Sequence, residues 1–223
     1  MRGKPLVIAI DGPAAAGKGT LARRVAEALD FAHLDTGLLY RAIGFAVLRA
    51  GKNPMDEAAV LATVTGPDAL HLDDPALRQD DVADAAAKVA TLPGVRKRLL
   101  QFQRDFAAAP PGGKKGAVVE GRDIGTAVLP DANLKIFLTA ALEIRAERRL
   151  KELRERGLQS IRSQLLREMR ERDQRDQNRA VSPLRPAEDA VTLDTTELDA
   201  DAAFEAAMTI IRSQKDFADK DRP

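Results

Sequence analysis

The feature that most constrains the fold is a glycine-bounded loop close to the start of the chain. Residues Leu6 to Ile10 form a continuous apolar run rich in β-branched side chains, as in a strand that is buried on both faces of a parallel sheet. The loop Gly12 to Thr20 follows, and apolar residues then recur at helical spacing from Lys18 to Leu29. A strand, a tight loop and a helix in this order open an α/β unit.

The composition of this loop is suited to binding phosphate. Glycines let the backbone curl around an anion, while backbone amides and a helix N-terminus supply positive charge. The spacing G-x-x-x-x-G-K matches the P-loop, with Lys18 able to follow the β- and γ-phosphates of ATP. Gly19 stands at the usual Ser/Thr position, and the hydroxyl of Thr20 comes next, near the expected metal. The predicted ATP-binding residues are Gly12, Pro13, Ala14, Ala15, Ala16, Gly17, Lys18, Gly19 and Thr20.

Further short apolar runs alternate with helical patterns along the chain. These runs are Phe31 to Leu34, Ala117 to Val119, Leu134 to Leu138 and Ala190 to Leu193. The alternation predicts a three-layer α/β/α fold with about five parallel strands and helices on both faces of the sheet. We expect one helix near Val82 to Phe106, and a highly charged one from Glu143 to Arg156 that ends at Gly157.

Composition argues against several classes of function. Lys and Arg total 35 and Asp and Glu total 34, so the net charge of +1 gives no reason to expect a nucleic acid or membrane partner. The chain has no cysteine, which removes disulfides, thiolate zinc sites and cysteine nucleophiles. The apolar N-terminal run is too short for a signal peptide, and no stretch approaches the ~20 apolar residues of a spanning helix. We expect a cytoplasmic monomer. His33 and His71, the two histidines, predict no metal site.

Two more polar turns directly follow apolar runs. Asp-Thr-Gly-Leu-Leu-Tyr-Arg at 35–41 follows the second run, and Glu-Gly-Arg-Asp-Ile-Gly-Thr at 120–126 follows the third. Ligand groups in open α/β sheets gather at the carboxyl ends of the strands. Because arginine presents a planar pair of donors that fits phosphate oxygens, Arg41 and Arg122 are candidates for binding a second phosphate.

A third arginine-rich segment, Glu-Arg-Asp-Gln-Arg-Asp-Gln-Asn-Arg, occupies residues 171–179 and is ended by Pro183. On a helix, Arg172, Asp176 and Arg179 fall at i, i+4 and i+7 and share one face. Taken alone, the segment favours an exposed helix that carries several salt bridges.

Together and in this order, the three segments resemble the motif set of the cytidylate kinase family. The resemblance covers about residues 5–195. It implies transfer of the γ-phosphoryl group of ATP to CMP or dCMP, with Mg²⁺. It also implies a single kinase domain over residues 1–223, with a core at 1–39, 91–145 and 164–223, an acceptor-binding insertion at 40–90 and a lid at 146–163. The insertion is short, and its strand-forming part reduces to Ala69–Leu72 and its neighbours.

The same resemblance implies roles for individual residues. Arg41, Arg122 and Arg179 would clamp the acceptor phosphate and act with Lys18 in catalysis. Arg172 and Asp176 would hold the sugar hydroxyl, while Asp123 and Arg96 would contact the cytosine edge. The implied substrate-binding residues are Thr36, Tyr40, Arg41, Arg96, Arg122, Asp123, Arg172, Asp176 and Arg179. In the lid, Arg148 and Arg149 would reach towards the transferred group.

The sequence departs from the family pattern at Ala15 and Ala87. Ala15 replaces a glycine, so the loop must accept a Cβ there. Ala87 replaces a serine that hydrogen-bonds the base, so discrimination of cytosine depends more on Asp123 and Arg96. A regulatory GTPase is disfavoured because no Asn-Lys-x-Asp occurs. A UMP/CMP, adenylate or shikimate kinase remains an alternative, as does a protein that senses ATP without transferring phosphate.

Overall fold

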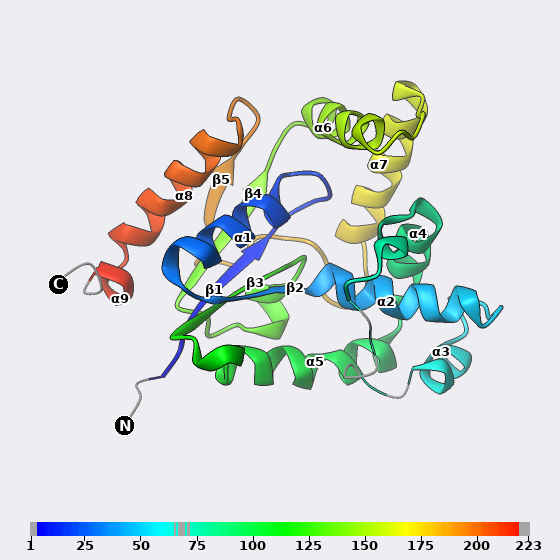
Figure 1. Ribbon diagram of the computed structural model, residues 1–223, viewed down its shortest axis with the longest axis horizontal. Coiled ribbons are helices and arrows are strands. Elements are labelled where there is room, and N and C mark those ends of the chain that lie inside the picture. The colour runs from blue at the N-terminus through cyan, green and yellow to red at the C-terminus, as the bar shows by residue number, and fades with distance from the viewer. Residues whose placement is uncertain (1–3, 65, 67–69, 71, 219–223) are drawn as a thin grey trace. The chain divides into compact units, whose positions relative to one another are not determined.

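The computed structural model describes residues 4–64, 66, 70 and 72–218 (Figure 1). The chain divides into two compact units. One, the sheet unit, comprises residues 1–33 and 110–223, and the other, the helical unit, comprises residues 34–109. The division of the chain into core, insertion and lid stays a prediction.

The sheet has five strands in the order β2-β3-β1-β4-β5. The strands are β1 (Leu6–Asp11), β2 (Ala32–Asp35), β3 (Gly116–Gly121), β4 (Leu134–Thr139) and β5 (Val191–Asp194). β1 runs parallel to both β3 and β4, and β4 runs parallel to β5. All five predicted strands are confirmed. The central strands β1 and β3 are almost wholly buried, which explains why their sequences are continuous apolar runs rather than alternating ones.

The helices of the sheet unit pack against one another and against the sheet. The unit contains α1 (Lys18–Leu29), α6 (Leu142–Glu155), α7 (Arg162–Gln177), α8 (Ala200–Ser213), α9 (Lys215–Ala218) and the short helices η3 (Pro111–Gly113) and η4 (Ile124–Val128). α1 packs against α8 and β3, and α6 packs against α7 (Figure 1). Ile8, Val25, Ile136 and Ile211 are buried in the main core. Leu150 and Met169 belong to a smaller core between α6 and α7.

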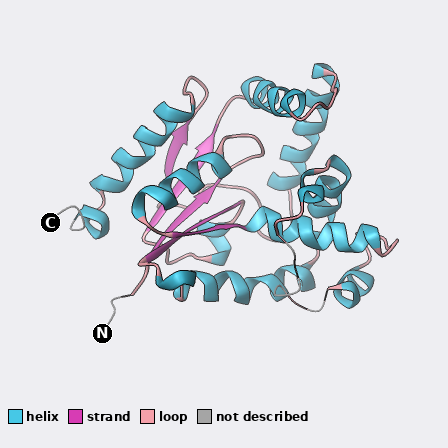
Figure 2. Cartoon of the chain, in the orientation of Figure 1, coloured by secondary structure: helices cyan, strands magenta, loops and turns pink. Residues whose placement is uncertain are grey.

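Apart from the end of β2, the described part of the helical unit contains only helices and loops (Figure 2). Its helices are α2 (Thr36–Arg49), α3 (Glu57–Thr63), η2 (Pro75–Arg78), α4 (Asp80–Val89) and α5 (Pro93–Ala108). α2 packs closely on α4 at Gly44, where an added Cβ would lie 2.8 Å from the backbone nitrogen of Ala86. No helix in the described ranges is long and apolar enough to cross a membrane.

The prediction of one helix from Val82 to Phe106 was wrong. α4 ends at Val89, and α5 begins at Pro93. Leu92 has an extended backbone (φ −81°, ψ 118°), as expected for a residue before proline, and Pro93 then starts the new helix at its first position.

The sequence also gave no sign of α3, whose N-terminus is capped by the Asp56 side chain accepting a hydrogen bond from the backbone N–H of Ala59 at 3.0 Å. In the expected strand-forming part, Ala69 and His71 lie outside the described residues, while Leu70 and Leu72 are in loop and turn conformations.

Candidate functional site

The loop between β1 and α1 has an unusual backbone at three residues. Gly12, Ala15 and Gly17 have φ values of 148°, 58° and 92°. A Cβ at Gly12 would lie 2.1 Å from the carbonyl oxygen of Leu138 in β4, so only glycine fits there. Gly17 is the N-cap of α1, and the loop therefore leads straight into a helix N-terminus with its unpaired amides. We call residues Gly12–Thr20 the phosphate loop.

Lys18, the first residue of α1, is 7% exposed, and its ammonium donates a hydrogen bond to the carbonyl of Pro13 at 2.7 Å. The loop thus fixes the position of its own cation. Thr20 is exposed, so its hydroxyl is accessible. Beside Gly19 lies the buried carboxylate of Glu120, which has an oxygen 3.5 Å from an ideal Cβ at Gly19 and which contacts Nε2 of His33 at 3.0 Å. These oxygen groups suit Mg²⁺ bound together with ATP phosphates. No group of three or more His, Cys, Asp or Glu in the described residues could hold a metal by itself.

Asp11 joins the phosphate loop to the turn that carries Arg122 and Asp123. It ends β1 opposite Gly121 in β3. Its two buried carboxylate oxygens accept hydrogen bonds from the backbone N–H groups of Ile124 at 2.8 Å and Gly125 at 2.7 Å. Asp11 was not among the residues predicted from the sequence, although it directly precedes the first glycine of the motif.

Burial raises the pKa of Asp11 to about 6, because the ionised carboxylate is removed from water. The hydrogen bonds from Gly125 and Ile124 act in the opposite direction, the negative charge of Asp123 adds to the rise, and the positive charge of Lys18 reduces it. Asp11 is therefore ionised at neutral pH, and its ionisation lowers the free energy of unfolding.

Three arginines surround the buried carboxylate of Asp176. Arg122 Nε lies 3.0 Å from Oδ2, and an Arg179 terminal nitrogen lies 2.7 Å from Oδ1. Burial alone would raise the pKa of Asp176, but the guanidinium groups of Arg122, Arg179 and Arg172 hold it below its usual value. We call these four residues the arginine cluster. The guanidinium groups of Arg122 and Arg179 thus lie against one carboxylate, and the positive charge of Arg172 also acts on it.

The predicted helix face was wrong for Arg179. α7 ends at Gln177 and Asn178 caps it, so only Arg172 and Asp176 lie on the helix. The chain then turns back, and the N–H of Leu184 donates to the backbone carbonyl of Asp176 at 2.8 Å. This turn brings Arg179 to the carboxylate of Asp176, so the two side chains meet although Arg179 is not on the helix.

Asp123 lies at the start of η4, next to Arg122. Its side chain is buried, and its backbone carbonyl accepts hydrogen bonds from Ala127 at 2.9 Å and Val128 at 3.1 Å. The structure therefore holds six of the expected catalytic and substrate-binding residues, namely Lys18, Arg122, Asp123, Arg172, Asp176 and Arg179, in buried or half-buried positions of the sheet unit.

The other expected residues belong to the helical unit. Thr36 is buried at the start of α2, after Asp35 has capped the helix through the N–H of Leu38. Tyr40 and Arg96 meet, with an Arg96 nitrogen 3.4 Å from the tyrosine oxygen. Arg41 donates to the backbone carbonyl of Leu77 at 2.7 Å. Their position towards a substrate stays a prediction.

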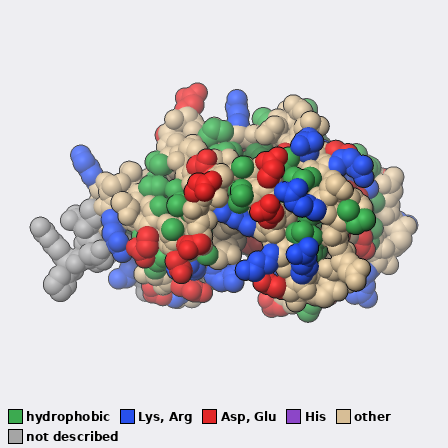
Figure 3. Space-filling view, turned by 90° about the horizontal axis from the view of Figure 1, so that it is seen from above, with side chains coloured by type: hydrophobic (Ala, Val, Ile, Leu, Met, Phe, Trp, Pro, Cys, Tyr) green, Lys and Arg blue, Asp and Glu red, His purple; other side chains and the backbone are tan. Residues whose placement is uncertain are grey.

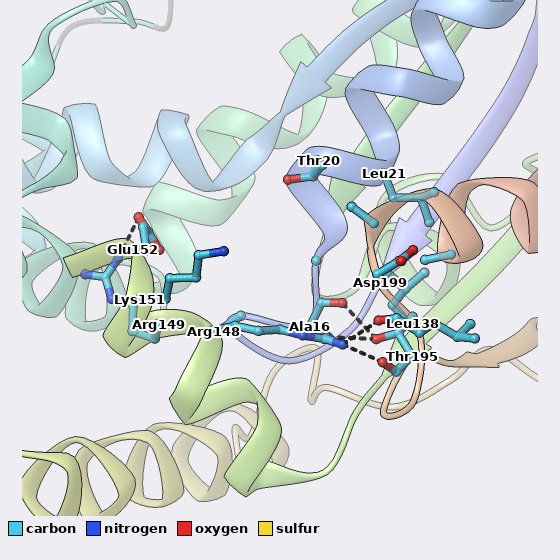
Figure 4. A pocket seen from close by; sticks show the side chains of 15 residues that line it. Ala16, Thr20, Leu21, Leu138, Arg148, Arg149, Lys151, Glu152, Thr195 and Asp199 are labelled. Atoms are coloured by element: carbon cyan, nitrogen blue, oxygen red, sulfur yellow. Dashed lines mark hydrogen bonds and ion pairs between the residues drawn. The ribbon is translucent and has the colours of Figure 1, made fainter. Parts of the chain in front are cut away.

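A cavity of about 510 Å³ opens beside the phosphate loop (Figure 4). This volume is in the range of small-molecule sites. Its walls come from the phosphate loop, from α6 and from the turn between β5 and α8. The labelled lining residues are Ala16, Thr20, Leu21, Leu138, Arg148, Arg149, Lys151, Glu152, Thr195 and Asp199.

Arg148 holds two walls of this cavity together. Its guanidinium donates to the hydroxyl and the backbone carbonyl of Thr195 at 3.0 and 2.5 Å, and to the carbonyl of Leu198 at 3.0 Å (Figure 4). The hydroxyl of Thr195 also lies 3.3 Å from the carbonyl oxygen of Ala16 in the phosphate loop. Thr195 follows the carboxyl end of β5, and this position was the sequence signal that could have identified it.

Charges of both signs are interspersed on the molecular face seen in Figure 3. This agrees with the net charge of +1. The positive charge that matters for an anionic ligand is therefore local, at Lys18 and in the arginine cluster.

Comparisons with known proteins point to one family. The family model described as "Cytidylate kinase" matches residues 8–213. A cytidylate kinase of Paramagnetospirillum magneticum is 61% identical over 211 residues, covering 94% of this chain and 99% of that protein. A cytidylate kinase of Rhodospirillum rubrum is 53% identical over 212 residues, covering 94% of this chain and 100% of that protein.

The fold also resembles solved structures. A gluconokinase from Sinorhizobium meliloti 1021 aligns with a TM-score of 0.50 at 15% identity, covering 99% of this chain and 100% of that chain. At this identity the likeness concerns the fold alone, and it agrees with the predicted α/β P-loop class.

Ala15 provides a test of strain in the phosphate loop. The left-handed region costs an alanine about 1–2 kcal/mol, whereas Ala16, which is 1% exposed, has no positive φ. We expect the Ala15→Gly variant to be at least as stable as the wild type, whereas Ala16→Gly, which also loses a buried methyl group, should be less stable, as measured by urea denaturation. Equal losses in the two variants would contradict strain at Ala15.

Asp11 provides a test by pH. Its folded-state pKa lies above the unfolded value, so the folded state holds the proton more tightly and stability falls as pH rises from about 4 through about 6. The Asp11→Asn variant lacks this titration. We expect the free energy of unfolding of the wild type, relative to that variant, to decrease by roughly 2 kcal/mol between pH 4 and pH 7. Denaturation curves across this range measure the difference, and a difference independent of pH would show that Asp11 is not perturbed.

Proposed function

The chain belongs to the cytidylate kinase family, and on this premise we propose that it transfers the γ-phosphoryl group of ATP to CMP or dCMP, giving ADP and CDP or dCDP. It is an ATP-dependent phosphotransferase. The observation that supports the proposal is the presence of two groups of positive charge on the sheet unit, which we assign to two anions. One is the phosphate loop with Lys18, and the other is the arginine cluster around Asp176.

The two sites suit a donor and an acceptor. Asp11 ends β1 directly before Gly12, and its carboxylate accepts hydrogen bonds from the turn that follows β3. Arg122 lies in this turn, so Asp11 connects it to the phosphate loop. We assign the phosphates of ATP to the phosphate loop, and the acceptor phosphate to Arg122 and Arg179, with Arg41 from the helical unit. The cavity lined by Thr195 and α6 is the assigned place of the ATP nucleoside, because it adjoins the loop.

The remaining acceptor contacts are proposed from the family motifs. Arg172 and Asp176 bind the sugar hydroxyl, and Asp123 and Arg96 recognise the cytosine edge. Thr36 and Tyr40 complete the acceptor site. The low pKa of Asp176 supports the sugar contact, because an ionised carboxylate accepts hydrogen bonds from hydroxyl groups.

Catalysis in this arrangement consists of positioning and charge stabilisation. The acceptor phosphate oxygen is itself the nucleophile, so the reaction needs no general base. Lys18 and the loop amides bind the charge that develops on the donor phosphates, while Arg122, Arg179 and Arg41 offset the repulsion between the two anions. A bound Mg²⁺ would supply positive charge that offsets the charge of the ATP phosphates. Thr20 and Glu120 are the residues proposed to hold it.

We also propose that the protein is a cytoplasmic monomer and that it acts without nucleic acid or membrane partners. The mixed surface charge supports this, since neither anionic polymers nor anionic lipids find a broad basic face in the view of Figure 3.

The acceptor specificity is tested by measuring ADP release in a coupled assay with CMP, dCMP, UMP, AMP and GMP in parallel. We expect CMP and dCMP to give the largest kcat/KM. A preference for AMP or UMP would instead identify another nucleoside monophosphate kinase. If ATP binds tightly and no acceptor stimulates ADP release, the protein is a nucleotide sensor and the proposal is wrong.

Arg122→Ala tests the division between donor and acceptor sites. An arginine that binds the transferring or accepting phosphate is worth about 10³-fold in rate. We therefore expect a fall of this order in kcat/KM for CMP with nearly unchanged affinity for an ATP analogue, measured by steady-state kinetics and calorimetry. Arg162→Ala, which removes a half-exposed arginine paired with Glu147 at 3.1 Å, is the control and should leave both values unchanged. A loss of ATP affinity without a loss of acceptor affinity would reverse the assignment.

A further inference from the structure

Arg145 is a buried arginine to which no role has yet been given. It lies in the first turn of α6, and its side chain is 6% exposed. All three of its guanidinium nitrogens donate hydrogen bonds. Nε donates to the carbonyl of Ala140 at 2.9 Å, one terminal nitrogen to the carbonyl of Ala14 at 3.2 Å, and the other to the Asp173 carboxylate at 2.6 Å. With its nitrogens used inside the protein, Arg145 is a positioning residue rather than a group that binds substrate.

The contacts of Arg145 connect the two anion sites. Ala14 belongs to the phosphate loop, while Asp173 lies on α7, one turn before Asp176. α6 and α7 lie side by side (Figure 1). A continuous path therefore runs from the phosphate loop through Arg145 and Asp173 to the carboxylate that holds Arg122 and Arg179.

Stability alone does not explain this buried pair. A buried ion pair is on balance a weak source of stability, because the desolvation of both charges offsets their attraction. What such a pair does provide is a fixed geometry, here between α6, α7 and one carbonyl of the phosphate loop. Only one carboxylate oxygen of Asp173 accepts a hydrogen bond from Arg145. The other oxygen, Oδ1, is buried and has no hydrogen bond.

We propose that the Arg145–Asp173 pair couples binding at the arginine cluster to the geometry of the phosphate loop, so that an occupied acceptor site strengthens donor binding. The inference rests on the proposed function, because it takes the cluster as the acceptor site. An acceptor that draws Arg122 and Arg179 towards its phosphate weakens their ion pairs with Asp176. The position of α7 then changes, and Asp173 and Arg145 pass this change on to the carbonyl of Ala14. Coupling between sites is reciprocal, so the donor strengthens acceptor binding by the same factor.

The test is the dissociation constant of a non-hydrolysable ATP analogue, measured by calorimetry with and without saturating CMP. The ratio of the two constants is the coupling factor, expected to be about tenfold in the wild type. We expect Asp173→Asn, which keeps the shape of the side chain, and Arg145→Lys to bring the ratio close to one while CMP alone still binds. The double variant is expected to lose no more than either single variant, because both substitutions remove the same link.

Glu147 and Arg162 provide a matched control. They also join α6 to α7 at 3.1 Å, but their side chains are 55% and 52% exposed and neither contacts the phosphate loop. Glu147→Gln is expected to keep the wild-type coupling factor. A merely structural role of Arg145 would lower the melting temperature and leave the ratio unchanged in the folded variants, and this result would overturn the proposal.

Hydrogen exchange of the wild type needs no variant and decides the question if the substituted proteins do not fold. CMP alone is expected to slow exchange of the amides in residues 12–17. Unchanged exchange there, with CMP bound, would overturn the coupling. If CMP neither binds nor accepts phosphate, the proposed function fails. If CMP is phosphorylated but the wild-type ratio is one, only the coupling fails.

Discussion

The close approach of the chain to the carbonyl of Leu138 is the constraint on which the site depends. Because Gly12 has no Cβ, the backbone can leave β1 and turn sharply across the end of β4, where a side chain would collide with this carbonyl. The loop then enters α1 at Gly17, and the amides at the helix N-terminus point back into the turn. A side chain at Gly12 would displace the loop from the strand ends, and Lys18 and Ala14 would move with it.

Buried charges then fix the surroundings of this loop. Asp11 holds the turn that carries Arg122, Asp176 holds Arg122 and Arg179, and Arg145 holds the loop itself. Each of these groups lost water on burial, and Asp11 has a raised pKa as a result. These buried charges lower the free energy of unfolding of the sheet unit at neutral pH, and they hold these groups in one arrangement. Such a loss of stability is common at functional sites.

Much of the sheet unit could be predicted from the sequence. Parallel strands buried on both faces leave continuous apolar runs, so Leu6–Asp11 and Leu134–Thr139 were visible, and glycine spacing located the phosphate loop. Local patterns were less informative where tertiary contacts decide. The break before Pro93 and the end of α7 at Gln177 were missed, although Pro93 carried a signal for the first.

Long-range pairs could not be seen in any sequence window. Arg145 and Asp173 are 28 residues apart, and neither is distinguished from the many other charged residues of α6 and α7 by its spacing. The same holds for Asp11 and Gly125, which are 114 residues apart. The family motifs named residues such as Arg41 and Arg96, but no local pattern encodes the contacts that these side chains make with Leu77 and Tyr40.

The ammonium of Lys18 has a consequence for ligand discrimination. Folding has already stripped most of its hydration shell and given it the neutral carbonyl of Pro13 instead. If a phosphate oxygen replaced that carbonyl, the ammonium would exchange a neutral dipole for a full negative charge, and this exchange favours anions over neutral molecules of the same shape. An arriving anion would therefore meet a cation that the fold has already positioned at the start of α1.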